Sequence, residues 1–227
     1  MTINQRIKRV RSQIEGYCLD CKRDPNAVLL LAVSKTKPVS DIVAAYELGV
    51  RDFGENYCQE ALAKQQELTD YDITWHFIGP IQANKTKHIG QHFSWVHSVD
   101  SLKIAKRLSD QRPDYLAPLN ICLQVNVSGE DTKSGITLAE LPELCQTIET
   151  LPRLKLRGVM AIPAPQDDFE QQRMPYRLLV QAVAKLKRPE LDTFSFGMSG
   201  DLKAAIVEGA TIVRIGTALF GVRKNAV

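Results

Sequence analysis

Residues 27–38 read Ala-Val-Leu-Leu-Leu-Ala-Val-Ser-Lys-Thr-Lys-Pro, and this stretch decides the fold. Its first seven residues are all apolar, and they lie between Pro25 and Pro38. Seven apolar residues are too few to span a membrane. They match instead a short strand that is covered on both faces, as the strands of a parallel sheet are. The segment therefore predicts a buried β-strand.

Lys35, just after the apolar run, is a candidate reactive residue. Alternation along a strand places Leu29, Leu31, Val33 and Lys35 on one face, so the ammonium emerges where the apolar column ends. A partly desolvated lysine loses affinity for its proton and becomes a nucleophile that forms a Schiff base with a carbonyl. A surface lysine that opens a loop is the simpler alternative, and this stretch alone does not decide between the two.

Seven more segments of the same kind follow along the chain. With the first, the apolar, β-branched or aromatic runs lie near residues 28–35, 52–55, 75–79, 94–99, 119–127, 156–162, 193–197 and 211–216. Amphipathic segments separate them near residues 39–48, 57–68, 81–90, 101–111, 137–150, 168–187 and 200–208. This alternation predicts a (β/α)8 TIM barrel, with a doubly wound sheet as the alternative.

An additional amphipathic segment near residues 2–21 precedes the first strand. We expect this N-terminal helix to fill the place of the helix that would follow strand eight. Several later helices begin with capping chemistry: Ser101 precedes one, and Thr137 with Glu140 forms a capping-box pattern before another. No linker, charge block or repeat divides residues 1–227, so we expect a single domain.

The composition limits the classes of partner. The 227 residues carry 29 basic and 26 acidic side chains, for a net charge of +3. This nearly balanced charge gives no indication of a protein that binds nucleic acid or an anionic membrane. The first residues are charged and periodic, unlike a signal peptide, and no segment is long enough for a transmembrane helix. With an odd number of cysteines, five, the sequence predicts a cytoplasmic protein.

Two residue pairs resemble metal or redox motifs. Cys18 and Cys21 form a Cys-x-x-Cys pair, but both fall on the apolar stripe of the first helix, which favours packing. His88 and His92 are four residues apart, yet no Glu follows His88 and no third ligand is evident. We therefore expect no metal site.

Four polar or polarisable residues lie in or directly after predicted strands, where the geometry of a barrel makes them candidates for the functional site. Chemistry in this architecture takes place at the carboxyl ends of the strands. Lys35 ends strand one and Asn56 ends strand two, while His76 lies within strand three and Met160 closes strand six. We expect these side chains to face one mouth of the barrel.

Phosphates in this architecture bind at the loops after strands seven and eight. Residues 196–201 form a strand-to-helix turn, and we expect Ser199 to cap the next helix, where free N–H groups attract a phosphate. After strand eight, Gly216 lets an anion approach the backbone and Thr217 adds a hydroxyl donor. Either turn alone is typical of simple capping. Together, beside a Schiff-base lysine, they favour an aldehyde that carries a phosphate.

Arg214 is unusual inside an apolar strand. A permanently charged guanidinium is costly to bury without a partner. One interpretation is an ion pair with Glu55 or another carboxylate of the barrel. The other is a hydrogen bond to the ring nitrogen of a pyridoxal cofactor.

Six segments together resemble one known family. They are Leu30–Pro38, Phe53–Tyr57, Trp75–Gln82, Gly158–Pro163, Gly197–Ser199 and Val213–Thr217. In this order they resemble the pyridoxal 5′-phosphate homeostasis protein family, the bacterial YggS and eukaryotic PROSC group. The resemblance covers nearly the whole chain, and its departures, Ile81 and Gly200, are mild. It implies a single barrel like the N-terminal domain of alanine racemase.

The same resemblance implies how pyridoxal phosphate is bound. Lys35 would carry the cofactor as an internal aldimine. Ser199, Gly216 and Thr217 match positions that hold the phosphate, with Gly200 at the same turn. Arg214 matches the arginine that faces the pyridine nitrogen. The pocket lining would come from Asn56, His76 and Met160.

The implied function is to hold pyridoxal phosphate and supply apo-enzymes in vitamin B6 homeostasis, without appreciable catalysis. Related racemases add a second domain with a catalytic tyrosine, for which we see no room before Val227. An arginine at the ring nitrogen also weakens the ring as an electron sink. Without a dimerising domain we expect a monomer. Two alternatives stay open: a slow amino-acid racemase that uses His76 or a lysine as second acid/base, and a cofactor-free Schiff-base aldolase.

Overall fold

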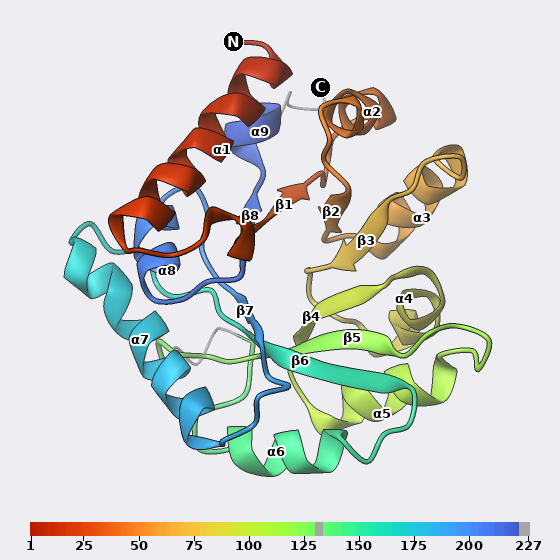
Figure 1. The fold of residues 1–227 in the computed structure, drawn as a ribbon. Helices are drawn as coiled ribbons and strands as arrows, with labels where there is room; N and C mark the ends of the chain where they lie inside the picture. The colour runs from red at the N-terminus through yellow and green to blue at the C-terminus, as the bar shows by residue number, and fades with distance from the viewer. Residues whose placement is uncertain (130–133, 223–227) are drawn as a thin grey trace.

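The computed structural model describes residues 1–129 and 134–222. Within them, eight parallel strands close into a barrel in chain order, because β8 also pairs with β1. The strands are β1 (Leu29–Val33), β2 (Asp52–Glu55), β3 (Thr74–Phe77), β4 (Trp95–Val99), β5 (Leu119–Gln124), β6 (Leu154–Met160), β7 (Thr193–Ser195) and β8 (Ile212–Ile215). The helices lie outside the strands (Figure 1). The predicted (β/α)8 barrel is confirmed.

The helices fall where the amphipathic segments predict them, with one addition. They are α1 (Ile3–Asp20), α2 (Val39–Glu47), α3 (Cys58–Glu67), α4 (Thr86–His92), α5 (Leu102–Gln111), α6 (Leu141–Ile148), α7 (Phe169–Lys185), α8 (Leu202–Val207) and α9 (Thr217–Phe220). Short 3-10 turns, Pro25–Ala27 and Ala83–Lys85, precede β1 and α4. The four-residue α9 was not predicted, because a single turn has no apolar period.

One of the two predicted caps is present, and the hydrogen bonds of the other form one turn before their helix begins. Ser101 Oγ accepts a hydrogen bond from the Ile104 N–H at 3.4 Å, at the start of α5. Thr137 and Glu140 exchange hydrogen bonds, since the Thr137 N–H donates to Glu140 Oε2 at 2.8 Å and the Glu140 N–H donates to Thr137 Oγ1 at 3.3 Å. That exchange stands one turn ahead of α6, which begins only at Leu141.

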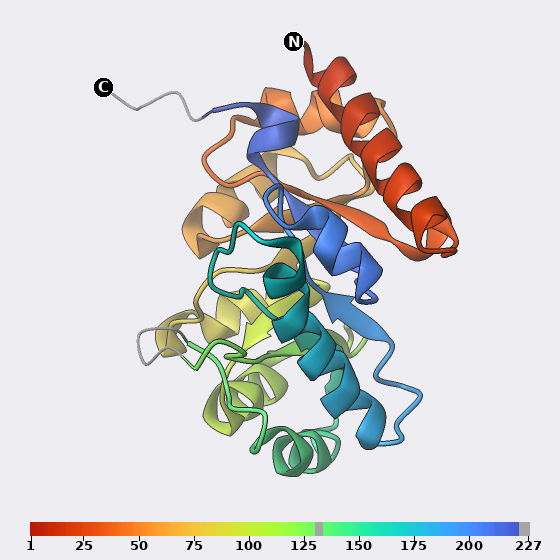
Figure 2. The same ribbon diagram turned by 90° about the vertical axis from the view of Figure 1, so that its left-hand side faces the viewer.

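Helix α1 takes the place of the helix that would follow β8, as the sequence predicts. It packs along α8 and α9, and two views at right angles show this arrangement (Figures 1 and 2). Ile7, Val10, Ile14 and Cys18 form its buried stripe, so Cys18 is a packing residue. No helix among the described residues is both long and apolar enough to cross a membrane.

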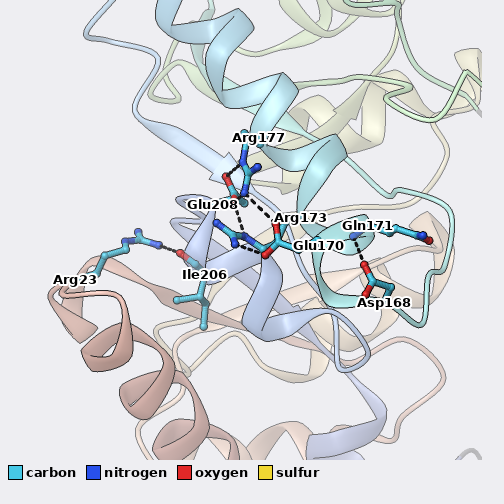
Figure 3. A network of polar contacts seen from close by, with 8 residues as sticks. All are labelled: Arg23, Asp168, Glu170, Gln171, Arg173, Arg177, Ile206 and Glu208. Atoms are coloured by element: carbon cyan, nitrogen blue, oxygen red, sulfur yellow. Dashed lines mark hydrogen bonds and ion pairs between the residues drawn. The ribbon is translucent and has the colours of Figure 1, made fainter.

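Outside the barrel wall, polar contacts hold α8 in place (Figure 3). Glu208, the C-cap of α8, accepts hydrogen bonds from Arg173 at 2.6 Å and from Arg177 at 3.0 Å, both in α7. From the turn after α1, Arg23 donates to the carbonyls of Ile206 and Ala210. Because α8 follows the β7 turn, these contacts also restrain the predicted phosphate loop.

The two faces of the barrel wall differ in chemistry. Outward residues such as Ala32, Phe53 and Phe77 belong to a continuous apolar core beneath the helices. The inward Leu31 and Met160 are equally buried but share the lumen with polar side chains. Apolar burial outside the wall therefore supplies most of the hydrophobic stabilisation, and the lumen has room for polar groups.

Candidate functional site

Lys35 lies in the turn after β1, at the carboxyl edge of the barrel. The strand ends at Val33, two residues earlier than predicted, and Lys35 is half-buried. The next residue, Thr36, has a φ of 61°, in the left-handed region that non-glycine residues rarely adopt. Lys37 is directed elsewhere, because its Nζ donates to the Gly221 carbonyl at 3.0 Å, past the end of α9.

A buried ion cluster outside the wall holds this turn. Glu55 Oε1 accepts from Ser34 Oγ at 2.6 Å and from Lys64 Nζ at 2.7 Å. Lys64 also donates to the Ser34 carbonyl at 2.8 Å and to Glu60 at 2.6 Å. Glu60 in turn accepts from the Thr36 N–H, which keeps that residue in its unusual conformation. We name Ser34, Glu55, Glu60 and Lys64 the outer cluster.

The outer cluster excludes one of the two interpretations of Arg214, an ion pair with Glu55. Glu55 faces the helices, whereas Arg214 is buried in the lumen. The guanidinium donates from Nη1 to Ser195 Oγ at 2.9 Å and to the Ser195 carbonyl, and from Nη2 to the Ala161 carbonyl at 3.1 Å. Among the described residues it contacts no carboxylate. Burial lowers the pKa of Arg214 below its ordinary value.

A line of hydrogen bonds continues from Arg214 across the lumen. Ser195 Oγ lies 2.7 Å from His97 Nδ1, and His97 Nε2 lies 2.9 Å from His76 Nδ1. His76 Nε2 then lies 2.9 Å from Asp52 Oδ1, at the amino end of β2. We name Asp52, His76, His97, Ser195 and Arg214 the inner chain. Sequence analysis singled out only His76 and Arg214 of these five.

His76 lies deeper than the mouth that it was predicted to line. Its side chain is fully buried and both ring nitrogens are hydrogen-bonded. Ile78, two residues further along the same face, lines the mouth above it. Burial lowers the pKa of His76, and the pKa of His97 falls well below its ordinary value for the same reason. Met160, also predicted to line the pocket, is fully buried in the lumen.

Asn56 stands at the mouth, directly after β2. It lines a cavity of about 350 Å³ with Ser98, Asp100 and Ile162, among others. Its Oδ1 is buried without a hydrogen-bond partner among the described residues, which is costly unless a ligand or water supplies a donor. A Cβ at Gly79 would lie 2.2 Å from the Asn56 carbonyl oxygen, so only glycine fits against Asn56.

The turn after β7 is fixed by glycine and by an aspartate. Gly197 has a φ of 83°, and a Cβ there would lie 2.5 Å from the Cβ of Ala205. Asp201, not Ser199 as predicted, is the N-cap of α8, and it accepts from the Met198 N–H at 2.7 Å. Ser199 and Gly200 are exposed, and their N–H groups donate to no described residue. They remain available to an anion.

The turn after β8 lies against the end of β1. A Cβ at Gly216 would lie 3.3 Å from the Val33 carbonyl oxygen, so the two backbones are close. Thr217 begins α9 and is exposed. With Ser199 and Gly200 it lines one cavity of about 550 Å³, whose other wall is α1. The structure thus brings the two predicted phosphate turns together.

Comparisons with known proteins agree over nearly the full chain. Residues 22–224 match the family model described as "Alanine racemase, N-terminal domain". The chain is 56% identical over 222 residues to the pyridoxal phosphate homeostasis protein of Pseudomonas aeruginosa, covering 98% of this chain and 96% of that one. It is 50% identical over 226 residues to the protein of the same name in Escherichia coli, covering 97% of each.

One solved structure contains the cofactor. PipY of Synechococcus elongatus with pyridoxal phosphate bound superposes with a TM-score of 0.83 at 37% identity. The superposition covers 97% of this chain and 100% of PipY. The two proteins therefore share one fold over nearly their whole lengths.

Proposed function

This chain belongs to the pyridoxal phosphate homeostasis protein family, and we propose that it holds pyridoxal 5′-phosphate at its barrel mouth through Lys35. The pairing of β1 with β8 is the observation that carries the proposal. It sets the turn that contains Lys35 beside the Gly216–Thr217 turn, because Val33 and Gly216 are in near contact. A primary amine on a turn beside a predicted phosphate turn suits a small aldehyde that carries a phosphate.

The remaining residues of the mouth fit the same molecule. Ser199 and Gly200 offer N–H donors and Thr217 offers a hydroxyl, which are the groups that bind phosphate oxygens. The unpartnered Asn56 Oδ1 accepts a hydrogen bond from a polar group of the ligand. Arg214 supplies a donor that does not lose its proton at neutral pH. Each group has a complement on a phosphorylated pyridine aldehyde.

Each part of the site has a distinct task in binding. Bound pyridoxal phosphate supplies an aldehyde, which an amine captures reversibly. Lys35 supplies the amine, and the outer cluster fixes the turn on which it stands. Arg214 would face the ring nitrogen as a hydrogen-bond donor that keeps its own proton, so that nitrogen would stay unprotonated. The phosphate loops give affinity without touching the aldehyde.

Homeostasis follows from reversible capture. A protein that holds the cofactor covalently but reversibly keeps its free concentration low and releases it when apo-enzymes take it up. We infer that apo-enzymes dependent on pyridoxal phosphate are the recipients, and that the protein acts as a cytoplasmic monomer. The five free cysteines, four of them buried, are in keeping with a reducing compartment.

The alternative of a slow amino-acid racemase needs a second acid/base group. The candidates were His76 or a lysine, and His76 is fully buried, with one nitrogen hydrogen-bonded to Asp52 and the other to His97. This burial argues against proton transfer between His76 and a substrate. Solvent deuterium at the α-carbon of an added amino acid would favour the racemase over the carrier.

The test is a titration with pyridoxal phosphate followed by visible absorption. Wild-type protein is expected to develop the absorption band of the captured aldehyde, and Lys35→Arg is expected not to, because a guanidinium does not capture aldehydes. Lys37→Arg is the matched control: it keeps the positive charge near the carbonyls that Lys37 contacts and should behave as wild type. A band that persists in Lys35→Arg would contradict the assignment, and no band in wild type would favour the cofactor-free aldolase.

A further inference from the structure

The inner chain crosses the barrel rather than following its wall. Ser195 in β7 and His97 in β4 come from strands that are not neighbours, yet they are in hydrogen-bond contact through the lumen. His76, His97 and Ser195 are fully buried. Only the ends differ: Arg214 is 4% exposed, and the side chain of Asp52 is 21% exposed, at the amino end of the barrel.

One arrangement of protons satisfies all four contacts of the inner chain. Arg214 can only donate, so Ser195 Oγ accepts from it and its own hydrogen goes to His97 Nδ1. A neutral His97 then carries its proton on Nε2 and donates to His76 Nδ1. His76 likewise donates from Nε2 to Asp52. Every hydrogen bond points from the cation toward the carboxylate.

This direction has an electrostatic consequence. Arg214 is a buried cation whose direct contacts are two backbone carbonyls and one hydroxyl. Such a cation needs a compensating charge. Aligned hydrogen bonds in a medium of low dielectric polarise one another, so a carboxylate at the far end still stabilises the cation. Asp52 is the carboxylate that ends the inner chain, whereas Asp201, whose charge also acts on Arg214, lies outside the inner chain.

We propose that Asp52 is a remote counter-charge of Arg214, acting beside Asp201, and that His76, His97 and Ser195 transmit the charge of Asp52 and orient the guanidinium toward the ring of bound pyridoxal phosphate. The proposal rests on the proposed function, and it makes Asp52, His97 and Ser195 positioning residues. We expect none of the three to touch the cofactor, because His97 and Ser195 are fully buried and Asp52 lies at the amino end of the barrel. They set how strongly Arg214 donates to the ring nitrogen.

The first test needs no cofactor. ¹⁵N NMR of the histidine side chains in ligand-free protein reports which ring nitrogen carries the proton. His76 and His97 are expected to be neutral with the proton on Nε2. The exposed His88 and His92 serve as internal references, because their ring protons exchange between the two nitrogens. A proton on Nδ1 of either buried histidine would overturn the direction of the chain.

The second test separates charge from hydrogen bonding. Asp52→Asn keeps an oxygen that accepts from His76 but removes the negative charge. It is expected to weaken pyridoxal phosphate binding by about fivefold and to shift the absorption maximum of the bound cofactor. Asp72→Asn, an exposed change of equal charge just before β3, is the matched control and should shift neither. Equal behaviour of the two variants would refute Asp52 as counter-charge.

The third test measures coupling. Ser195→Ala cuts the chain but leaves Arg214 its carbonyl contacts. If charge passes through the hydroxyl, Asp52→Asn added to Ser195→Ala shifts the spectrum no further, whereas additive shifts would overturn the proposal. Failure of the wild-type protein to bind the cofactor would instead refute the proposed function. The proton positions in ligand-free protein would still show whether the hydrogen bonds of the inner chain run in the proposed direction.

Discussion

Two sets of buried charges flank the wall of the barrel, and they are held in different ways. In the outer cluster, Lys64 touches two carboxylates directly, Glu55 at 2.7 Å and Glu60 at 2.6 Å. In the inner chain, three neutral side chains separate Arg214 from its carboxylate, Asp52. Direct contact fixes atoms, because a buried pair that loses one partner leaves an uncompensated charge. A chain of dipoles instead transmits charge over a distance.

The difference matches the tasks of the two regions. The outer cluster binds the backbone on both sides of Lys35, through the Ser34 carbonyl and the Thr36 N–H, so it positions the amine. The inner chain reaches the site only through Arg214, so it sets charge and not the path of the backbone. Breaking the outer cluster should therefore lower the free energy of unfolding, and breaking the inner chain should change the affinity for the cofactor and its absorption.

The largest effect is expected from Lys64→Ala. Removal of this ammonium leaves Glu55 buried with its charge uncompensated, which costs about 3–5 kcal/mol in the free energy of unfolding. Urea unfolding followed by circular dichroism measures this loss. The double variant Glu55→Gln/Lys64→Met removes both charges and should recover most of the stability. A loss below about 1 kcal/mol in Lys64→Ala would show that the cluster behaves as a surface pair.

Gly216→Val should come next, because Gly216 lies between the two regions. A Cβ there would already lie 3.4 Å from the Val33 Cβ, and the added methyls press on the end of β1. Overpacking of this kind costs about 1–3 kcal/mol, and it moves the phosphate turn away from the Lys35 turn. Binding of pyridoxal phosphate should fall more than binding of pyridoxal, which equilibrium titrations with both compounds compare. Equal losses would indicate a general distortion of the mouth.

The two regions should respond to pH in opposite directions. Burial raises the pKa of Glu55 above 4.5, so its contribution to stability is full below pH 4.5 and is lost as pH rises through the raised value. Burial lowers the pKa of His97 well below 6.5, so its contribution is present above pH 6.5 and is lost as pH falls. Each group changes the free energy of unfolding by at most about 1.4 kcal/mol per pH unit.

Difference measurements isolate these two slopes. Relative to Glu55→Gln, wild type should lose stability as pH rises above 4.5. Relative to His97→Gln, it should gain stability as pH rises toward 6.5. Glu67→Gln, an exposed change in the same helix as Lys64, should show no slope. Slopes of the same sign in the two comparisons would contradict the contrast between the regions.

The smallest effect is expected on the outer surface of α7, where Glu170 pairs with Arg173 and Arg177. Glu170 is 61% exposed, so water already screens its charge. Glu170→Ala should change the free energy of unfolding by less than about 1 kcal/mol and should not affect cofactor binding. Thermal unfolding and the same titration measure both. A loss comparable to that of Lys64→Ala would mean that burial is not what strengthens the outer cluster.

The sequence predicted much of this fold because its signals are local. An apolar run such as Ala27–Val33 has the period and length of a buried strand, and eight such runs between amphipathic segments leave few architectures. Lys35, Gly216 and Thr217 were singled out as candidates because function in a barrel of this type lies at the carboxyl ends of the strands. The ends of the strands were predicted less well. Strand β1 stops at Val33, two residues before the predicted end, and the turn that contains Thr36 follows it.

The rest depends on contacts between distant segments. Glu55 and Lys64 meet only because α3 folds back over β2, and no spacing in the sequence indicates that pair. His97 lies in an otherwise largely apolar strand, as His76 does. A polar residue at an inward position of such a strand was the signal in the sequence that could have indicated the inner chain. Asp201 rather than Ser199 caps α8 because the turn at Gly197 sets the helix start two residues later.

The central claim is that Lys35 is the residue that holds pyridoxal phosphate. Borohydride reduction of the loaded protein fixes the cofactor covalently to whichever lysine has captured it, and peptide mass spectrometry then locates it. The account predicts the added mass on the peptide that contains Lys35, with fragment ions that separate it from Lys37. The cofactor on any other lysine, with Lys35 unmodified, would contradict the account.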